Sequence, residues 1–510
     1  MKIGSRDKFL LLPVLLAIIF LQACNPSWED HYFDQEEYVD MKLWDAIKQE
    51  PRYSEFVGWV QEYQLDTLFK RDLSYTLFIP SNNAFEAFID TGYVMQQVVS
   101  YHVSPTLFLD RNVQTWKKLQ TYQGKFSLVE PGSNGYTYDQ IPMVFSSPLY
   151  LDGKFYEIAE VAIPRPNIYE YTAVHSSVLK SYIDSRDSVF LDRSLSMPIG
   201  FDPNGNTIYD SIMDVVNLFE LEYFPVSEEF RDQSATFVLF TQEQYIEALD
   251  EMAFNMGDDV SDHSDIPLDW QYNVLLPDFT KGAMYEGMLS YSDLMKDTLL
   301  SITGDSVIIN HQDIDPDSKF LCSNGLTYFY SNYTIDSSLY LGERMIEGED
   351  LIEAVGAGKY AWKENVSVAG AVIEPERSIA EEASNGALVN VSFGRSYSGN
   401  YSLEFGFQEV LPMKYRMEWR GNFRPSGMFA LYVNDERIGE FDSFRFNKSI
   451  ISVTGERFIS DNGINTKDFW LENINEYGDV RIRFEYLGSG GQTSNGLNID
   501  YIKLIPVIQE

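Results

Sequence analysis

Two ten-residue segments 160 positions apart share one pattern, and this repeat constrains the fold more than any other feature of the chain. Residues 76–85 read TLFIPSNNAF and residues 236–245 read TFVLFTQEQY, and the two align without a gap. In each copy a short apolar run is followed by Ser81 or Thr241, which can cap the helix that opens behind it. A repeat of this length indicates duplicated domains rather than a solenoid of short units.

Length and charge limit the classes of protein that this chain can belong to. With 510 residues, 44% of them hydrophobic, the chain can bury sizeable cores and is long enough for about three domains. Its 38 basic and 77 acidic residues give a net charge of -39, which repels a phosphate backbone, so no nucleic acid partner is expected. The 33 tyrosines and 34 phenylalanines favour strand-rich domains.

The first 23 residues have the pattern of a signal peptide. Lys2, Arg6 and Lys8 precede an apolar stretch over residues 9–20 that is too short to span a bilayer as an ordinary helix. The stretch ends in Leu-Gln-Ala-Cys, which resembles the bacterial lipobox and predicts lipidation of Cys24. The alternative is an uncleaved membrane anchor that happens to contain a cysteine. Cleavage would remove a net charge of +2 and leave a mature chain at -41.

An acidic leader over residues 24–39 follows the predicted cleavage site. Cys24 is followed by Asn25 rather than Asp, which argues against retention in the inner membrane. The leader resembles the tags that direct lipoproteins to the outer face of the outer membrane, although an ordinary solvated leader would look similar. We therefore expect a lipid-anchored outer-membrane protein that faces the cell exterior. The other cysteine, Cys322, lies in an apolar run and is better explained as a buried side chain than as a catalytic thiol.

The first copy of the repeat belongs to a longer series of motifs. Residues 76–85, 101–103 (Tyr-His-Val), 121–124 (Thr-Tyr-Gln-Gly) and 173–179 (Ala-Val-His-Ser-Ser-Val-Leu) occur in the order of four signatures of fasciclin domains. The chain therefore resembles this family over a first domain at residues 40–180. The resemblance implies an α+β fold, and a binding or adhesion module without catalytic residues.

A second fasciclin-like domain is expected over residues 181–345, in degenerate form. It keeps the segment 236–245 and ends in 324–330, which is similar to the closing Asn-Gly motif of the family, but the central Tyr-His motif is missing. We expect the apolar run 273–276 to form the strand at that position.

Residues 361–510, after a linker at 346–360, have the twofold alternation of half-buried strands. Tyr415, Met417 and Trp419 alternate with charged residues, and 480–486 show the same pattern. The predicted fold is an all-β sandwich. Residues 398–403 and 498–504 resemble strands of galactose-binding-like jelly rolls, a group that includes many carbohydrate-binding modules. Trp419 is expected in the core.

Four residues of this last module are candidate ligand contacts. Trp362 and Trp470 are not tied to a core face by the alternation, and Gln492 and Asn495 lie in a glycine-rich polar segment, residues 488–495, of the kind that often forms binding loops. The alternative is that this segment is a solvated hairpin tip.

No pattern of catalytic, metal or cofactor chemistry stands out. The five histidines are scattered, and no nucleophile elbow, phosphate loop or dinucleotide fingerprint is present. Residues 202–213 begin like a calcium loop but have Thr207 and Met213 where glycine and glutamate belong, so turn chemistry explains them better. We expect no catalytic residue, no metal and no cofactor.

These features together favour a non-catalytic surface lipoprotein. Lipoproteins of this build resemble accessory subunits of SusC/SusD-like uptake complexes, in which they sit beside a TonB-dependent transporter and a SusD-like lipoprotein and help to capture a glycan or peptide. The alternative is an adhesin that works alone and binds a matrix protein or glycan. A hydrolase whose site is assembled only by folding ranks third.

Overall fold

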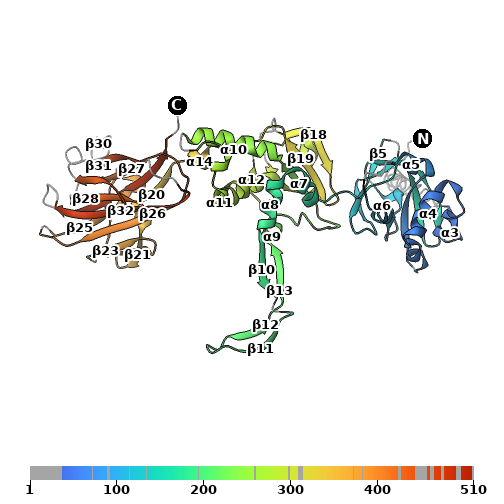
Figure 1. The fold of residues 1–510 in the computed structure, drawn as a ribbon, viewed down its shortest axis with the longest axis horizontal. Coiled ribbons are helices and arrows are strands. Elements are labelled where there is room, and N and C mark those ends of the chain that lie inside the picture. The colour runs from blue at the N-terminus through green and yellow to red at the C-terminus, as the bar shows by residue number, and fades with distance from the viewer. Residues whose placement is uncertain are drawn as a thin grey trace, which may run out of the picture.

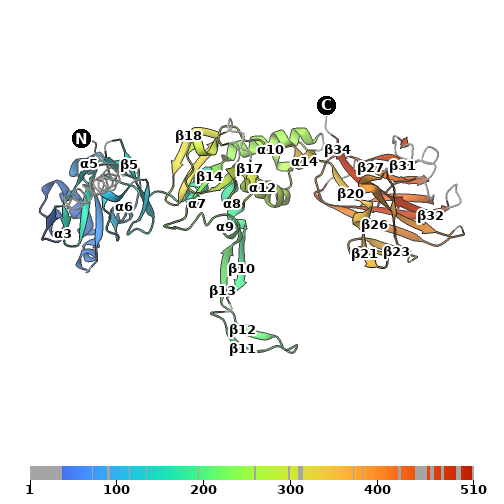
Figure 2. The same cartoon turned by 180° about the vertical axis from the view of Figure 1, so that it is seen from behind.

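Three modules lie in a row along the chain, and a two-stranded arm projects from the middle one (Figures 1 and 2). The first and third modules stand at opposite ends of the row, and the arm points away from its long axis in both views. The computed structural model describes residues 37–507, except residues 72, 89–91, 114, 134, 193, 258–259, 297–298, 308–313, 372, 382, 395, 423–426, 443–456, 460–463, 472–475 and 490–494.

The first module packs short helices against a nine-stranded sheet. Its core has two parts, one beneath the helices and one around Phe78 on the other side of the sheet. Its helices are α3 (Leu43–Ile47), α4 (Ser54–Glu62), α5 (Asn82–Ala87) and α6 (Met95–Tyr101), and its strands are β1 (Tyr38–Val39), β2 (Tyr75–Pro80), β3 (Val103–Ser104), β4 (Lys117–Gln120), β5 (Phe126–Gly132), β6 (Gly135–Tyr138), β7 (Ile141–Ser146), β8 (Leu149–Tyr150) and β9 (Gly153–Ile158).

The second module is richer in helix and has a four-stranded sheet in the order β15-β14-β19-β18. Its helices are α7 (Ile168–His175), α8 (Ser177–Ser185), α9 (Leu218–Glu222), α10 (Gln242–Met256), α11 (Leu268–Trp270), α12 (Leu276–Ala283), α13 (Tyr291–Leu294) and α14 (Ser338–Leu341). Its strands outside the arm are β14 (Ala235–Leu239), β15 (Met284–Glu286), β16 (Leu299–Leu300), β17 (Ser306–Val307), β18 (Ile314–Leu321) and β19 (Gly325–Tyr330).

The repeat in the sequence corresponds to a repeated arrangement of three strands. Strand β2 pairs with β3 in the antiparallel sense and with β9 in the parallel sense, and β14 pairs in the same way with β15 and β19. Ser81 accepts a hydrogen bond from the N–H of Ala84, and Thr241 accepts one from Gln244, so both predicted caps are confirmed.

Equivalent residues of the two copies also make equivalent contacts. The hydroxyl of Thr76 donates to the Thr106 carbonyl at 2.8 Å, and that of Thr236 donates to the Gly287 carbonyl at 2.7 Å. Glycine opens β9 and β19, and a Cβ at Gly153 or Gly325 would lie 2.2 or 2.0 Å from a carbonyl oxygen of the neighbouring strand. Both parallel pairings therefore need glycine at the first position of the strand.

Helices α7 and α8 lie in the second module, although the sequence placed residues up to 180 in the first domain. Ile168 is buried in the core of the second module, and Ser177 donates to the Gln242 side chain at 2.7 Å. The structural division between the two modules is therefore near residue 165. The run 273–276, expected as a strand, is helical. Gln271–Leu275 forms a π-helical turn, and this turn continues into α12.

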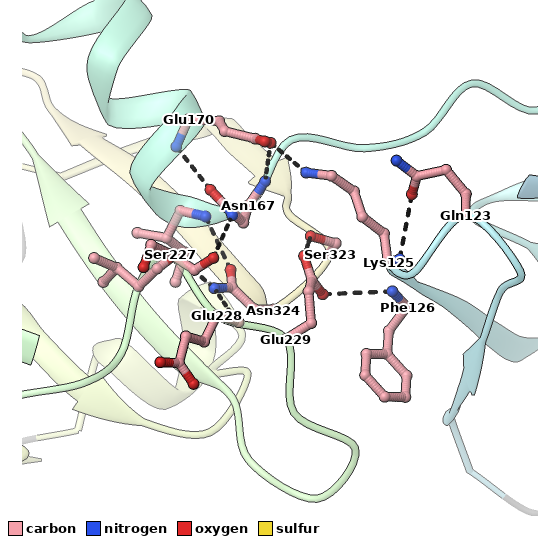
Figure 3. A network of polar contacts seen from close by, with 12 residues as sticks. Gln123, Lys125, Phe126, Asn167, Glu170, Ser227, Glu228, Glu229, Ser323 and Asn324 are labelled. Atoms are coloured by element: carbon pink, nitrogen blue, oxygen red, sulfur yellow. Dashed lines mark hydrogen bonds and ion pairs between the residues drawn. The ribbon is translucent and has the colours of Figure 1, made fainter. Parts of the chain in front are cut away.

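Polar contacts fix the first module to the second (Figure 3). Lys125 pairs with Glu170, which also accepts the N–H of Asn167 at 2.9 Å as part of the cap of α7. Glu229 accepts from the Phe126 N–H at 3.4 Å and from the Ser323 hydroxyl at 2.5 Å. These bonds join the start of β5 and the residue before it to Glu170 and Glu229 of the second module, so the two modules share a fixed interface.

The arm consists of two antiparallel hairpins joined end to end. Strand β10 (Asp187–Leu191) pairs with β13 (Met213–Asn217), and β11 (Met197–Phe201) pairs with β12 (Thr207–Asp210). At the tip, the Asp202 carboxylate accepts the N–H groups of Asn204 and Asn206 at 2.9 and 2.7 Å. The residues that began like a calcium loop therefore close a turn, as the sequence predicted.

The third module is a β-sandwich of two five-stranded sheets, β20-β34-β27-β31-β30 and β23-β26-β32-β28-β29, with a smaller sheet β24-β25-β33. Trp419 is 1% exposed and lies 5.5 Å from Phe484 of the facing sheet, which confirms its place in the core. The strands are β20 (Arg344–Glu347), β21 (Ile352–Gly356), β22 (Lys359–Trp362), β23 (Ser367–Gly370), β24 (Glu376–Ile379), β25 (Ala387–Phe393), β26 (Tyr401–Val410), β27 (Tyr415–Asn422), β28 (Gly427–Val433), β29 (Glu436–Asp442), β30 (Arg457–Ile459), β31 (Ile464–Leu471), β32 (Gly478–Ser489), β33 (Asn495–Ile499) and β34 (Tyr501–Pro506).

Residues 346–360, expected as a linker, belong to this sandwich instead. Strand β20 begins at Arg344 and pairs with β34 near the end of the chain, and β21 pairs with β22 as a hairpin. The segment is rich in glycine and acidic residues, as linkers often are. The partner of β20 lies more than 150 residues further along the chain, so nothing nearby in the sequence indicates the pairing. One hydrophobic cluster then runs from the second module into the third.

Candidate ligand-binding site

The third module has a cavity of about 710 Å³ beside strands β20, β23, β26 and β32. Its volume is within the range of small-molecule sites, and its lining is largely polar. The polar and charged residues that line it are Arg344, Asp350, Asn365, Ser367, Glu404, Gln408, Asp479 and Arg481.

Strand alternation explains why these side chains meet. Along β26 the residues Leu403, Phe405 and Phe407 point into the core, so Glu404, Gly406 and Gln408 point outward. The register pairs Gly406 with Arg481 of β32. A Cβ at Gly406 would lie 2.7 Å from the Val480 carbonyl oxygen, so β26 and β32 approach each other closely at this point.

Charges of both signs surround the cavity. Arg481 pairs with Asp435 at 2.8 Å, and Arg483 lies 3.6 Å from Glu404 and 4.0 Å from the centre of the Tyr432 ring. Arg344 donates to the carbonyl of Gln408. Such a mixture of fixed donors and acceptors suits a polar ligand of low net charge, such as a glycan or a peptide, better than a strongly anionic one.

Of the four residues that the sequence proposed as ligand contacts, the two whose side chains the structure describes lie elsewhere. Trp362 is half-buried at the end of β22, and its indole N–H donates to the Ile373 carbonyl at 3.4 Å. Asn495 is 3% exposed, and its amide donates to the Tyr486 hydroxyl inside the module. Neither lines the cavity. Trp470 is placed only by its pairing with Arg416 of β27, and Gln492 lies outside the described residues.

One feature of the sequence does indicate the cavity, although the ligand contacts were sought among aromatic residues and a glycine-rich segment instead. The alternation along β32 already separated Arg481, Arg483 and Glu485 from the core residues. What it could not give was the position of β20, which brings Arg344 to the same place from more than 130 residues earlier in the chain.

A buried group of carboxylates lies where β20 meets β34. Asp500 accepts the N–H of Ser384 at 2.9 Å and lies 3.3 Å from Arg420, and Glu347 accepts the Ser384 hydroxyl at 2.7 Å. Both oxygens of Glu349 are buried without a hydrogen-bond partner. Burial raises the pKa of Asp500 to about 7. In the described part of the chain, no group of three or more histidine, cysteine or acidic residues could hold a metal ion.

His102 has a structural environment. Its ring is fully buried, Nδ1 lies 2.7 Å from the Val98 carbonyl, and Nε2 accepts the N–H of Ala162 at 3.1 Å. Burial lowers the pKa of His102 to about 4, so the ring is neutral at pH 7. This agrees with a histidine whose two nitrogens are satisfied by the fold.

Among the residues that the structure describes, no helix is both long and apolar enough to cross a membrane. Cys24 and the leader lie outside the described residues. Cys322 is buried, and burial raises the pKa of its thiol to about 12, which keeps it protonated.

Comparison with known proteins identifies part of the chain. Residues 51–164 match the fasciclin domain family, which confirms the resemblance for the first module. Transforming growth factor-beta-induced protein ig-h3 of Oryctolagus cuniculus is 25% identical over 131 residues, which are 24% of this chain. The chain spans only 19% of the length of that relative.

Among solved structures, carbohydrate-binding modules resemble about a third of the chain. A family 35 module from Clostridium thermocellum is 14% identical, covers 32% of this chain and 99% of its own, and has a TM-score of 0.20. A family 11 module from the same organism, in complex with a beta-1,3-1,4-mixed-linked tetrasaccharide, is 12% identical with coverages of 33% and 99% and a TM-score of 0.21. Likenesses with such TM-scores assign no function to this chain.

Proposed function

We propose that this protein is a non-catalytic, lipid-anchored binding protein of the outer-membrane surface, and that its third module captures a glycan or peptide. The cavity of about 710 Å³ carries this proposal. Its size fits a small ligand, and most of its donors and acceptors are held on the strands of a sandwich rather than on long loops. The fasciclin domain in the first module favours a binding or adhesion role.

The order of the modules supports anchoring at one end and capture at the other. The N-terminal module, which follows the proposed lipid at Cys24, and the module with the cavity lie at opposite ends of the molecule (Figure 1). A mature chain at -41 is repelled by an anionic cell surface, so acyl chains rather than basic residues would hold it there. We also propose that the second module is a degenerate fasciclin-like domain. Its strands β14, β15 and β19 repeat the arrangement of β2, β3 and β9, and glycine opens both β9 and β19.

We propose further that the protein works as an accessory subunit of a SusC/SusD-like complex. The test is extraction of the lipidated full chain in mild detergent, followed by recovery on a C-terminal tag. A TonB-dependent transporter and a SusD-like lipoprotein should appear in amounts comparable to the tagged chain. Recovery of the chain alone, at low salt and with the lipid intact, would favour the alternative of an adhesin that works by itself.

The ligand site has its own test. Ser367 is exposed on β23 and lines the cavity, so Ser367→Trp should fill the space without disturbing the core. Ala369 is exposed on the same strand and does not line the cavity, which makes Ala369→Trp the matched control. Binding of oligosaccharides or peptides to the first variant should fall at least tenfold and should be unchanged in the second.

A further inference from the structure

The arm exposes an unusual number of large apolar side chains. Apolar residues of its β-strands point into solvent, although residues of this kind usually form a core. Phe201, for example, is 74% exposed. Six of them are more than half exposed. Three lie on β10 and β13 at the base of the arm and three on β11 in its outer half: Val189, Met213, Val215, Met197, Ile199 and Phe201.

The register gathers the apolar side chains at the base of the arm on one face. Val189 lies opposite Val215, and Leu191 lies opposite Met213, so these four side chains share one face of the β10–β13 hairpin. A hairpin of two strands is only marginally stable by itself in water. Exposed apolar patches of this kind mark sites of interaction, because soluble proteins otherwise avoid them.

We propose that the arm is a docking element that lies in an apolar groove of a different protein, and that lysine and arginine side chains line the rim of this groove. The charge of the arm leads to this partner. Residues 187–217 contain five aspartates and one arginine, a net charge of -4. A second copy of a chain at -39 would bring acidic residues against acidic residues, whereas a basic rim complements them.

A lipid surface does not fit the distribution of polar groups. The turn at the tip of the arm is polar, with Asp202, Asn204 and Asn206, and the exposed apolar side chains lie on the strands behind it. Insertion into a bilayer would bury this tip first and would leave the outer edges of a two-stranded ribbon without hydrogen-bond partners. In a protein groove, a strand of the partner can pair with such an edge.

The size of the arm is also sufficient. A standard protein interface involves about 20–30 residues and about 800 Å² on each side. The arm spans residues 187–217 and can therefore supply one side of such an interface by itself.

Site-specific photo-crosslinking in the full, lipidated chain tests the inference in intact cells. The crosslinking residue would replace Phe201 or Met213 on the arm and, as a control, Phe254, which is 79% exposed on α10 of the same module. Both arm positions should crosslink to one and the same other protein, at least tenfold above the control. The crosslinked peptides should come from an apolar groove with lysine or arginine at its rim.

Charge reversal adds a second measurement. Asp210 and Asp214 lie on β12 and β13, opposite Met197 and Phe190. Asp210→Lys combined with Asp214→Lys should lower the crosslinking yield at least tenfold. Crosslinks to a second copy of the chain, to lipid alone, to a groove without basic residues, or at no more than the control level would overturn the inference.

This inference deepens the accessory-subunit proposal, yet the two can fail separately. Asp187 and Asn217 are paired at the base of the arm, so a two-residue Asn-Gly turn can replace residues 188–216. If this variant still recovers the transporter pair, the arm does not bind that pair and the accessory role stands without it. If the arm of the wild type crosslinks to an unrelated protein with a basic-rimmed groove and the tagged chain recovers no transporter pair, the accessory role fails and the arm keeps its function.

Discussion

Phe78→Ala should destabilise the first module more than any single exposed substitution. Phe78 is fully buried on β2, and its ring lies 4.0 Å from that of Tyr138 and 5.7 Å from that of Tyr156, stacked on both. Truncation of a buried phenylalanine costs about 3–5 kcal/mol, and the loss of stacked pairs adds to this. We expect a loss of about 4 kcal/mol in the free energy of unfolding of this module.

Hydrogen exchange measures this effect without separating the modules. A loss of about 4 kcal/mol corresponds to an increase of roughly 10³-fold in the exchange rate of the amides that open with the module. Peptides that cover β2 and β9 should show this increase, while those that cover β14 should not. Phe254→Ala, at an exposed position on α10, is the control and should change neither. An increase of less than tenfold in β2 and β9 would refute the assignment of Phe78 to the core.

Three further predictions concern other parts of the chain. Burial lowers the pKa of His102 to about 4 in the folded state, against 6.5 in the unfolded state, so the neutral ring contributes its full stabilisation above pH 6.5. The free energy of unfolding of the first module, measured by hydrogen exchange, should fall by about 3 kcal/mol as the pH drops to 4. An equal loss in His102→Gln would contradict this. Gly153→Ala and Gly325→Ala should each destabilise their own module by several kcal/mol in thermal melts because the new Cβ meets a strand carbonyl, whereas Gly58→Ala, with open space on α4, should be neutral or stabilising. Labelled palmitate should mark the wild type, and Cys24→Ala should be unlabelled and released from the membrane; label on the variant would refute lipidation.

The elements that the sequence predicted well are those set by local chemistry. Ser81 and Thr241 cap helices, and Asp202 closes a turn with Asn204 and Asn206, because each pattern acts within a few residues. The helix at 273–276 was missed because a short apolar run fits a strand and a buried helix equally well. Residues 346–360 were taken for a linker, but they hold the end of β20, whose partner β34 is distant in sequence, and most of the β21–β22 hairpin.

The arm and the cavity illustrate a different limit. The strands of the arm are as apolar as core strands, and the sequence does not say whether the surface that covers their side chains belongs to the same chain. The cavity depends on Arg344 reaching β26 and β32 from another sheet. Trp362 and Trp470 were chosen as aromatic ligand contacts, but for Trp362 the structure shows packing against the core instead.

The central claim is that the protein holds its ligand and does not change it. The most direct test is to incubate the purified ectodomain with a defined pool of oligosaccharides and peptides and to separate the bound from the free compounds rapidly. Mass spectrometry then measures the molecular masses in the bound and the free fraction. The account predicts a bound ligand of unchanged mass that is lost with Ser367→Trp and kept with Ala369→Trp, and no new masses in solution. New product masses above the blank, or a bound ligand that is indifferent to Ser367→Trp, would contradict it.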